Sequence, residues 1–410
     1  MRQGCISRSA RRIAARRSAG IAIGVVAAMA LAACASSANS TSSGGGSTSS
    51  DVFSFGVNVP LSGADGIYGQ EAQQVVGLAI ANIEKSHMIK GTIQPYYYDS
   101  QDSPEVAVTG YNQLVSVRHA LGVETLLSAN VKAQAPIATE NKVPVFNVGG
   151  SSPDLVGLSP YLFNLLPLGG EQLKVSMPWA AQQGLKKWAV LYSTDSLGLA
   201  LNQSISQDAS KYGISVAGSA SVDPSASDFQ SQIAQLKQYG ANEIYIATSE
   251  GGAVPTFVTQ ARAAGYTGAF LSYNGTTTPA LLKDKDANGL VYTSVDIDLT
   301  QKDPVMQAYA TAYQAKYHTA PLDYQATDYN AVLVFARAIQ ELQSENMPVT
   351  GANIATAIHK VGTFDLVGGS TVILSDNTVA PPISLNQVVV DGSAGSIKVL
   401  QTLTPDQYNK

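Results

Sequence analysis

An α/β fold is the class that this sequence predicts, and three observations support it. From Asp51 onward, short runs rich in β-branched and aromatic residues alternate with longer stretches of helical period, as in parallel sheets flanked by helices. This alternation occurs in two successive sets, which meet near Gly170. The chain has 410 residues, 45% of them hydrophobic, so it is long enough to bury a large core. We therefore expect two α/β domains.

The first set contains four predicted strands and three predicted helices. Ser103-Pro104-Glu105 and Ser152-Pro153-Asp154 each offer a hydroxyl N-cap, a proline at the first helical position and an acid in the first turn, so each predicts a helix start. The predicted strands are 53–59, 92–98, 124–128 and 143–148, and the predicted helices are 68–85, 104–118 and 132–140.

The second set continues the pattern to the end of the chain. Pro178 lies inside a predicted helix, where we expect a kink or a break. The predicted helices are 170–183, 197–212, 228–239, 253–264, 305–317, 324–343 and 351–361. The predicted strands are 188–192, 215–220, 243–247, 269–272 and 290–295, with strand and turn over 364–400.

The N-terminus has the organisation of an export signal. Six arginines and no acid precede an apolar run from Ala19 to Ala33, and Leu31-Ala32-Ala33-Cys34 resembles the bacterial lipobox. That resemblance implies that residues 1–33 are removed and that Cys34 carries lipid. The alternatives are an ordinary secretory signal with a chance cysteine, or a membrane-spanning helix, for which the run is short. Residues 35–50 contain only small and polar side chains, which predicts a disordered tether of about 20–24 Å.

Charge and cysteine content exclude several function classes. Removal of residues 1–33 changes the formal net charge from −5 to −11, because the six arginines leave with them. An acidic chain without a basic cluster opposes nucleic-acid binding. The chain has two cysteines, Cys5 in the signal and Cys34, so the mature fold has none for disulfides, thiolate metal sites or nucleophilic catalysis.

Several segments carry a family likeness in their chain order. They are Phe55 to Gly63 followed by Tyr68-Gly69-Gln70, Tyr98 to Pro104, Val143 to Phe146, Tyr161-Leu162-Phe163, Asp228-Phe229, Ala261-Arg262-Ala263-Ala264-Gly265 and Asp328 to Val332. Because these segments occur together and in this order, the chain resembles the bacterial extracellular solute-binding proteins of the leucine/isoleucine/valine-binding type. Those proteins have the type I periplasmic binding fold.

This resemblance implies two Rossmann-like lobes with parallel sheets, joined by three hinge crossovers, which close around a solute. We expect the crossovers near 168–171, 296–300 and 375–382. Lobe 1 then comprises 51–168 plus 299–376, and lobe 2 comprises 169–298 plus 377–410. In open α/β sheets ligands bind at the carboxyl ends of the strands, which places the solute where the two lobes face each other.

In the first lobe this rule selects the segments 62–69, 129–132 and 149–152. Gly150 and Ser151 lie between a strand end and a helix start, where amides and hydroxyls suit a carboxylate, although a capped turn is the alternative. Asn130 falls where amino-acid binders of the family hold the carboxylate with a serine. Tyr68 matches a tyrosine at the cleft mouth, with packing of a helix-start aromatic ring within its own lobe as the alternative.

The second lobe departs from the family pattern. Leu197 stands where the family has a tyrosine, and Asn274 stands where amino-acid binders place an acid that pairs with the ammonium. A buried unpaired ammonium is costly, so a free amino acid would need another carboxylate. Asp195 and Glu250 are the available acids, with helix capping as their alternative role. If neither contacts the solute, we expect an acid, an amide or a neutral polar compound.

Catalysis has little support in the sequence. No nucleophile elbow, zinc-protease motif, Walker loop or dinucleotide fingerprint occurs, and the four histidines are scattered over predicted helices. We therefore expect no enzyme activity, no cofactor and no metal. The expected protein is a monomeric, lipid-anchored extracytoplasmic receptor that delivers a small organic solute to an ABC permease in the cytoplasmic membrane. The alternatives are a sensor ectodomain that signals to a membrane partner and, with least support, a surface hydrolase.

Overall fold

Five parallel strands form the first sheet of the protein. The computed structural model describes residues 51–249, 253–274, 276, 278–295, 303–321, 325–392 and 394–410. The strand order is β2-β1-β3-β4-β5, and every pairing in this sheet is parallel. Its elements are β1 (Val52–Val59), α1 (Gly66–Ser86), β2 (Thr92–Asp99), α2 (Pro104–Ser116), β3 (Val123–Thr125), α3 (Ser128–Asn141), β4 (Val145–Asn147) and β5 (Leu162–Asn164).

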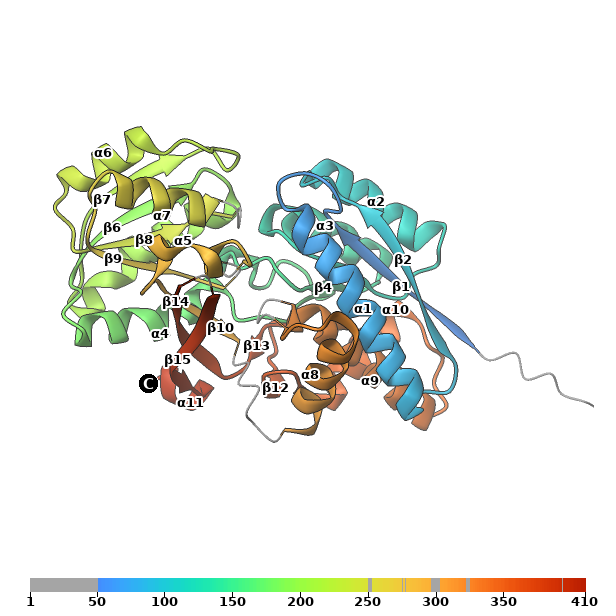
Figure 1. The fold of residues 1–410 in the computed structure, drawn as a ribbon. Helices are drawn as coiled ribbons and strands as arrows, with labels where there is room; N and C mark the ends of the chain where they lie inside the picture. The colour runs from blue at the N-terminus through green and yellow to red at the C-terminus, as the bar shows by residue number, and fades with distance from the viewer. Residues whose placement is uncertain are drawn as a thin grey trace, which may run out of the picture. The chain divides into compact units, whose positions relative to one another are not determined.

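The second sheet has seven strands in the order β15-β14-β10-β9-β8-β6-β7 (Figure 1). Strands β6 to β10 pair in parallel, whereas β14 and β15 add an antiparallel edge. Its elements are α4 (Gly169–Gln182), β6 (Lys187–Ser193), α5 (Ser196–Asp208), β7 (Ser215–Val222), α6 (Gln230–Gln238), β8 (Glu243–Ala247), α7 (Ala253–Ala263), β9 (Ala269–Ser272), β10 (Val291–Val295), β14 (Ile383–Asp391) and β15 (Ala394–Leu403).

The chain passes between the two sheets three times: from β5 to α4, from β10 to α8 (Pro304–Tyr317) and from β13 (Val379–Ala380) to β14. The first and third passages lie at the crossover positions predicted from the sequence, and the predicted crossover at 296–300 is outside the described residues. The remaining elements are α8 (Pro304–Tyr317), α9 (Ala326–Ser344), α10 (Gly351–Val361), a small antiparallel sheet of β11 (Thr363–Leu366), β12 (Gly369–Ile373) and β13 (Val379–Ala380), and α11 (Pro405–Tyr408). The exact lobe boundaries stay a prediction.

Each large sheet is covered by helices on both faces, which explains its nearly continuous apolar strands. On the first sheet, Phe55 and Phe146 pack toward α1, α9 and α10, whereas Val123 and Val145 pack toward α2 and α3. Helices α1 and α9 lie side by side in this arrangement (Figure 1). The second sheet is built in the same way, with one core against α6 and α7 and another against α4 and α5. No helix among the described residues has both the length and the apolar content to cross a bilayer.

Most predicted elements are present, and the exceptions have local causes. Helix α3 begins at Ser128, four residues before the prediction, and takes in what was expected to be the end of a strand and a loop. Ser103 caps α2 as predicted and accepts a hydrogen bond from the Val106 amide at 3.3 Å. Ser152, in contrast, starts a single 3₁₀ turn, because Val156 is extended and Gly157 has a φ of 71°.

The break that was one of two expectations at Pro178 is absent, and one strand was missed. Helix α4 continues through Pro178 without a break, because the fully buried Met177 and Ala180 hold both sides of the proline in the core. Strand β5 was not predicted, since three residues between two turns give no measurable alternation. In both cases packing against the rest of the protein decides the local structure.

Candidate functional site

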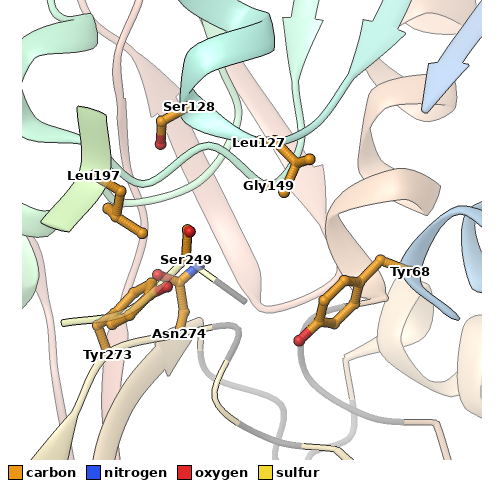
Figure 2. A pocket seen from close by; sticks show the side chains of 8 residues that line it. All are labelled: Tyr68, Leu127, Ser128, Gly149, Leu197, Ser249, Tyr273 and Asn274. Carbon is orange, nitrogen blue, oxygen red and sulfur yellow. The ribbon is translucent and has the colours of Figure 1, made fainter. Parts of the chain in front are cut away.

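A cavity lies where strands of both sheets end at their carboxyl sides. About 320 Å³ of space between protein atoms lies within it, including the part that is open to solvent. Figure 2 shows Tyr68 on one side of this cavity and Leu197, Ser249, Tyr273 and Asn274 on the other. We call it the inner cavity, and its lining residues are Tyr68, Leu127, Ser128, Gly149, Leu197, Ser249, Tyr273 and Asn274.

A second cavity of about 530 Å³ adjoins the inner one and is called the outer cavity. The two share four lining residues, so they form one continuous cleft. The shared residues are Leu127, Ser128, Leu197 and Ser249, and the outer cavity adds Asp65, Asp102, Ala129, Asn130, Asp195 and Pro224.

The first-sheet wall is built around the start of α3. Leu127 precedes the helix with a φ of 69°, a positive value that is uncommon for leucine, at the turn from β3 into α3. Ser128 Oγ then accepts a hydrogen bond from the Ser152 amide at 3.1 Å, which joins this turn to the segment after β4. Tyr68, in the first turn of α1, is 6% exposed. On this wall the inner cavity is therefore lined by the hydroxyl groups of Tyr68 and Ser128 and by the side chain of Leu127, which are all uncharged.

The second-sheet wall comes from the ends of β8 and β9 and the start of α5. Tyr273 donates a hydrogen bond from its hydroxyl to the Thr248 carbonyl at 2.7 Å, which fixes its ring against the neighbouring strand end. The Ser249 amide donates to Ser193 Oγ at 3.3 Å. Leu197, at the start of α5, is 5% exposed and supplies the apolar part of this wall. The inner cavity is therefore lined by both polar and apolar groups.

Among the described residues, the charged groups that line the cleft lie in the outer cavity. Asp195 caps α5, where its Oδ1 accepts from the Gly198 amide at 2.9 Å and from Ser193 Oγ at 2.8 Å. Burial raises the pKa of Asp102, the largest effect on that carboxyl. Among the described residues, no lining side chain of the inner cavity carries a charge.

The predicted site residues occupy different parts of this cleft. Tyr68 and Asn274 line the inner cavity, and Asn130 and Asp195 line the outer one. Whether any of them contacts a solute stays a prediction. Glu250, like the proposed lipid site Cys34, is outside the described residues.

The structure does not place Gly150 or Ser151 among the residues that line either cavity. The Gly150 amide donates to Asn147 Oδ1 at 2.7 Å, so the protein itself takes the group that was expected to bind a carboxylate. Ser151 Oγ donates to Asn274 Oδ1 at 2.8 Å. Gly149, one residue earlier, lines the inner cavity instead.

Several lining residues were not among the sequence-predicted contacts. Tyr273 comes directly after β9 and Ser249 lies two residues after the end of β8, so the strand-end rule applied to every strand would have selected them. Leu127 and Ser128 were assigned to a strand, and only the early start of α3 brings them to the cleft. A positive φ at a leucine has no sequence signal, because leucine is not favoured there.

Comparison with known proteins places the chain in a family. Residues 53–394 match the family of periplasmic binding proteins. A Leu/Ile/Val-binding protein homolog 3 from Brucella melitensis is 25% identical over 316 residues, which are 75% of this chain and 83% of the relative.

Solved structures share the fold at low sequence identity. The leucine-binding protein LivK from Thermotoga maritima has a TM-score of 0.77 at 20% identity, covering 86% of this chain and 99% of that one. A solute-binding protein of an ABC transporter from R. palustris, in complex with benzoate, has a TM-score of 0.76 at 15% identity, with 87% and 97% covered. LivJ from Streptococcus pneumoniae, in complex with isoleucine, has a TM-score of 0.75 at 19% identity, with 86% and 99% covered. The chain therefore belongs to the periplasmic binding protein family, whose members are extracytoplasmic binding proteins and not enzymes.

Proposed function

We propose that the protein binds a small organic solute in the inner cavity and delivers it to an ABC import permease. The observation that carries this proposal is the composition of the cavity, whose lining comes from the strand ends of both sheets. A solute there would contact Tyr68 and Ser128 on one wall and Tyr273 and Asn274 on the other. Solved structures of similar fold in complex with isoleucine and with benzoate support a small organic solute.

The mechanism that follows is a shift in population between open and closed forms. In this proposal residues 51–168 with 299–376 form one lobe, and residues 169–298 with 377–410 form the other. A solute that contacts both lobes stabilises the closed form, in which the lobes are close together. The size of this stabilisation equals the difference between the binding free energies of the solute for the closed and the open form. The permease then distinguishes loaded from empty receptor by the closed form.

A tryptophan at position 197 is expected to abolish solute binding. Leu197 lines both cavities and is 5% exposed, so the larger indole would occupy the space that the solute needs. Leu199→Trp, two residues further along the same helix, is the matched control because Leu199 is 50% exposed. The measurement is a thermal-shift screen of amino acids, aromatic acids and amides, together with native mass spectrometry of the purified wild-type protein.

The result that supports the cavity is a solute-dependent shift of at least a few degrees in wild type and Leu199→Trp, and none in folded Leu197→Trp. If Leu197→Trp binds the same solute with unchanged affinity, the solute does not occupy this cleft. If nothing binds to the wild type in either measurement, the proposed function itself is wrong.

We also propose that Cys34 carries a lipid that holds the receptor at the membrane beside its permease. The support is the lipobox-like ending and the residues 35–50, which would give a tether of about 20–24 Å. Cys34→Ser should move the protein from the membrane fraction to the medium or the soluble fraction and remove labelling by a palmitate analogue. Alanine replacement of Cys5, which precedes the proposed cleavage site, should change neither. A Cys34→Ser protein that stays lipid-labelled would overturn the assignment.

A further inference from the structure

Gln172 is a buried side chain whose four hydrogen bonds connect the cleft to the chain between the sheets. It lies in the first turn of α4 and has no exposed surface. Its Nε2 donates to the Pro167 carbonyl at 2.7 Å and to Asn274 Oδ1. Its Oε1 accepts from the Asn274 amide at 2.9 Å and from Thr293 Oγ1 at 2.8 Å. Every hydrogen-bonding group of this side chain is therefore occupied.

The orientation of the Gln172 amide is determined by two backbone groups that cannot be exchanged. The Pro167 carbonyl can only accept a hydrogen bond, and the Asn274 N–H can only donate one. If the amide of Gln172 were rotated by 180°, an oxygen would face the carbonyl and an NH₂ group would face the N–H. Both arrangements leave buried polar groups unsatisfied, each at a cost of about 1–3 kcal/mol. The NH₂ group of Gln172 therefore faces the Asn274 side chain.

This orientation in turn determines how Asn274 lies. Because Gln172 presents a donor, Asn274 must turn its Oδ1 toward it, and Ser151 Oγ donates to the same oxygen at 2.8 Å. Both acceptor positions of Oδ1 are thus used inside the protein. Asn274 Nδ2 donates to no described residue, and Asn274 lines the inner cavity (Figure 2). The group that Asn274 offers to a solute is a hydrogen-bond donor.

We propose that Gln172 is a positioning residue that selects the solute by holding Asn274 with its amide nitrogen toward the inner cavity. The proposal rests on the proposed function and names the chemical class of the solute. At this wall the site takes an oxygen acceptor, such as the carbonyl of a 2-oxo acid or a carboxylate oxygen, and it disfavours an ammonium group. An ammonium here would face an NH₂ group, so two donors would meet without an acceptor between them.

Matched compound pairs test this selection. Each pair consists of an amino acid and the 2-oxo acid of the same side chain, for example leucine with 4-methyl-2-oxopentanoate and phenylalanine with phenylpyruvate. The two members differ in whether a donor or an acceptor stands at one carbon. For the pair that binds more tightly, we expect calorimetry to show that the wild type binds the 2-oxo acid at least about tenfold more tightly than the amino acid. This is the ratio expected when one hydrogen bond is lost and its partner is left unsatisfied.

Asn274→Asp should reverse this preference by at least about tenfold in the ratio of the two affinities. The aspartate keeps one oxygen for Gln172 Nε2 and Ser151 Oγ and places its second oxygen where the amide nitrogen was. It thereby gives an ammonium both an acceptor and an opposite charge. Because aspartate and asparagine have almost the same shape, the fold should be retained, which circular dichroism will show.

Two substitutions at Gln172 separate positioning from simple structural support. Gln172→Glu has at most one proton to share between the Pro167 carbonyl and Asn274, so Asn274 can rotate and present its oxygen to the cavity, and the affinity ratio should move toward the amino acid. Gln172→Met removes all four hydrogen bonds and should weaken the binding of both members of a pair. It should change the ratio of the two affinities less than Gln172→Glu does. If both variants at Gln172 change the ratio equally, Gln172 acts only as structural support and the proposal fails.

The outcomes for the wild type also separate the two proposals. Wild-type protein that binds the amino acid as tightly as its 2-oxo partner would overturn the selection, and an acid such as Glu250 would then supply the counter-charge. An unchanged ratio in folded Asn274→Asp would overturn it as well. If neither member of any pair, nor any solute carried through purification, binds to the wild type, the proposed function fails and the selection fails with it.

Discussion

Raising the pH from 5 to 9 should destabilise the wild-type protein by about 2–4 kcal/mol more than a variant that carries Glu124→Gln and Asp328→Asn. Glu124 in β3 has no exposed surface, and Asp328 in α9 is 3% exposed. Their carboxyl groups lie close enough to form a hydrogen bond once one of them holds a proton, and each affects the pKa of the other. Among the described residues, no third residue donates a hydrogen bond to either oxygen of Glu124 or to Asp328 Oδ1. Two facing carboxyl groups can form that hydrogen bond only if they hold a proton.

The sign of the pH effect follows from the direction of the pKa changes. Burial, the largest effect, raises the pKa of Glu124 well above its usual value, and the neighbouring Asp328 raises it further. Burial likewise raises the pKa of Asp328 to about 8, and the charge of Glu71 adds to this. These two carboxyl groups therefore bind protons more tightly in the folded protein than in the unfolded protein. The contribution of the protonated pair to the free energy of unfolding is fully present below about pH 4 and is lost as the pH rises to about 8.

The measurement is urea unfolding at pH 5, 7 and 9 for both proteins. The two side-chain amides that replace the carboxyl groups in the variant can hydrogen-bond to each other without an added proton, so this contribution to the pH dependence should disappear. Glu243, whose pKa burial also raises, is unchanged in both proteins and cancels in the comparison. Glu84→Gln, a substitution at an exposed acid of α1, is the control for charge alone. If the free energy of unfolding changes with pH in the same way for the wild type and the double variant, the buried pair holds no proton.

Gly198→Ala should lower the free energy of unfolding by about 2–3 kcal/mol and weaken solute binding as well. A Cβ at this position would lie 2.1 Å from the Ser193 carbonyl oxygen and 2.5 Å from the Ser193 nitrogen. Both are backbone atoms of β6, so they cannot rotate away. The first turn of α5 must move, and this displaces Leu197 from the cavity and stretches the Asp195 cap at Gly198.

Gly77→Ala is the matched control for this substitution. Gly77 lies within α1, and no heavy atom of another part of the chain is within 4 Å of the position that its Cβ would take. Alanine is favoured over glycine in a helix, so this variant should gain about 0.5–1 kcal/mol. Chemical unfolding of both variants checks the prediction, and a Gly198→Ala protein as stable as Gly77→Ala would contradict the close approach of α5 to β6.

The order of elements could be predicted because local signals and burial agree over most of the chain. The strand at 243–247 and the helix at 351–361 were predicted to the residue, since a continuous apolar run and a capped amphipathic helix are strong local signals. The signals failed where other parts of the chain override them. Pro178 is tolerated because its helix is held on both sides by the core, and Ser152 does not open a longer helix because Gly157 turns the chain away.

The cleft lies where the strand-end rule expects a ligand site, whereas the contacts within it could not be predicted. The rule that ligands bind at strand ends, together with the family resemblance, selected Tyr68 and Asn274, and both line the inner cavity. It could not show that the Gly150 amide is taken by Asn147, since that hydrogen bond depends on how the turn after β4 folds back. Nor could any spacing pattern identify Gln172, whose partner Asn274 is 102 residues away in the chain.

The sequence by itself determined the α/β class, the order of the elements and the absence of cysteine chemistry in the part expected to remain after export. These properties depend on residue type and on periodicity over short stretches, which a single chain displays directly. The tertiary structure alone decided which polar atoms remain available in the cleft. Asn274 is an equally good donor and acceptor in the sequence, and it becomes a donor only because Gln172 and Ser151 take its oxygen. Hydrogen-bonding capacity belongs to a residue, whereas what it offers to a solute depends on the neighbours that use the rest of that capacity.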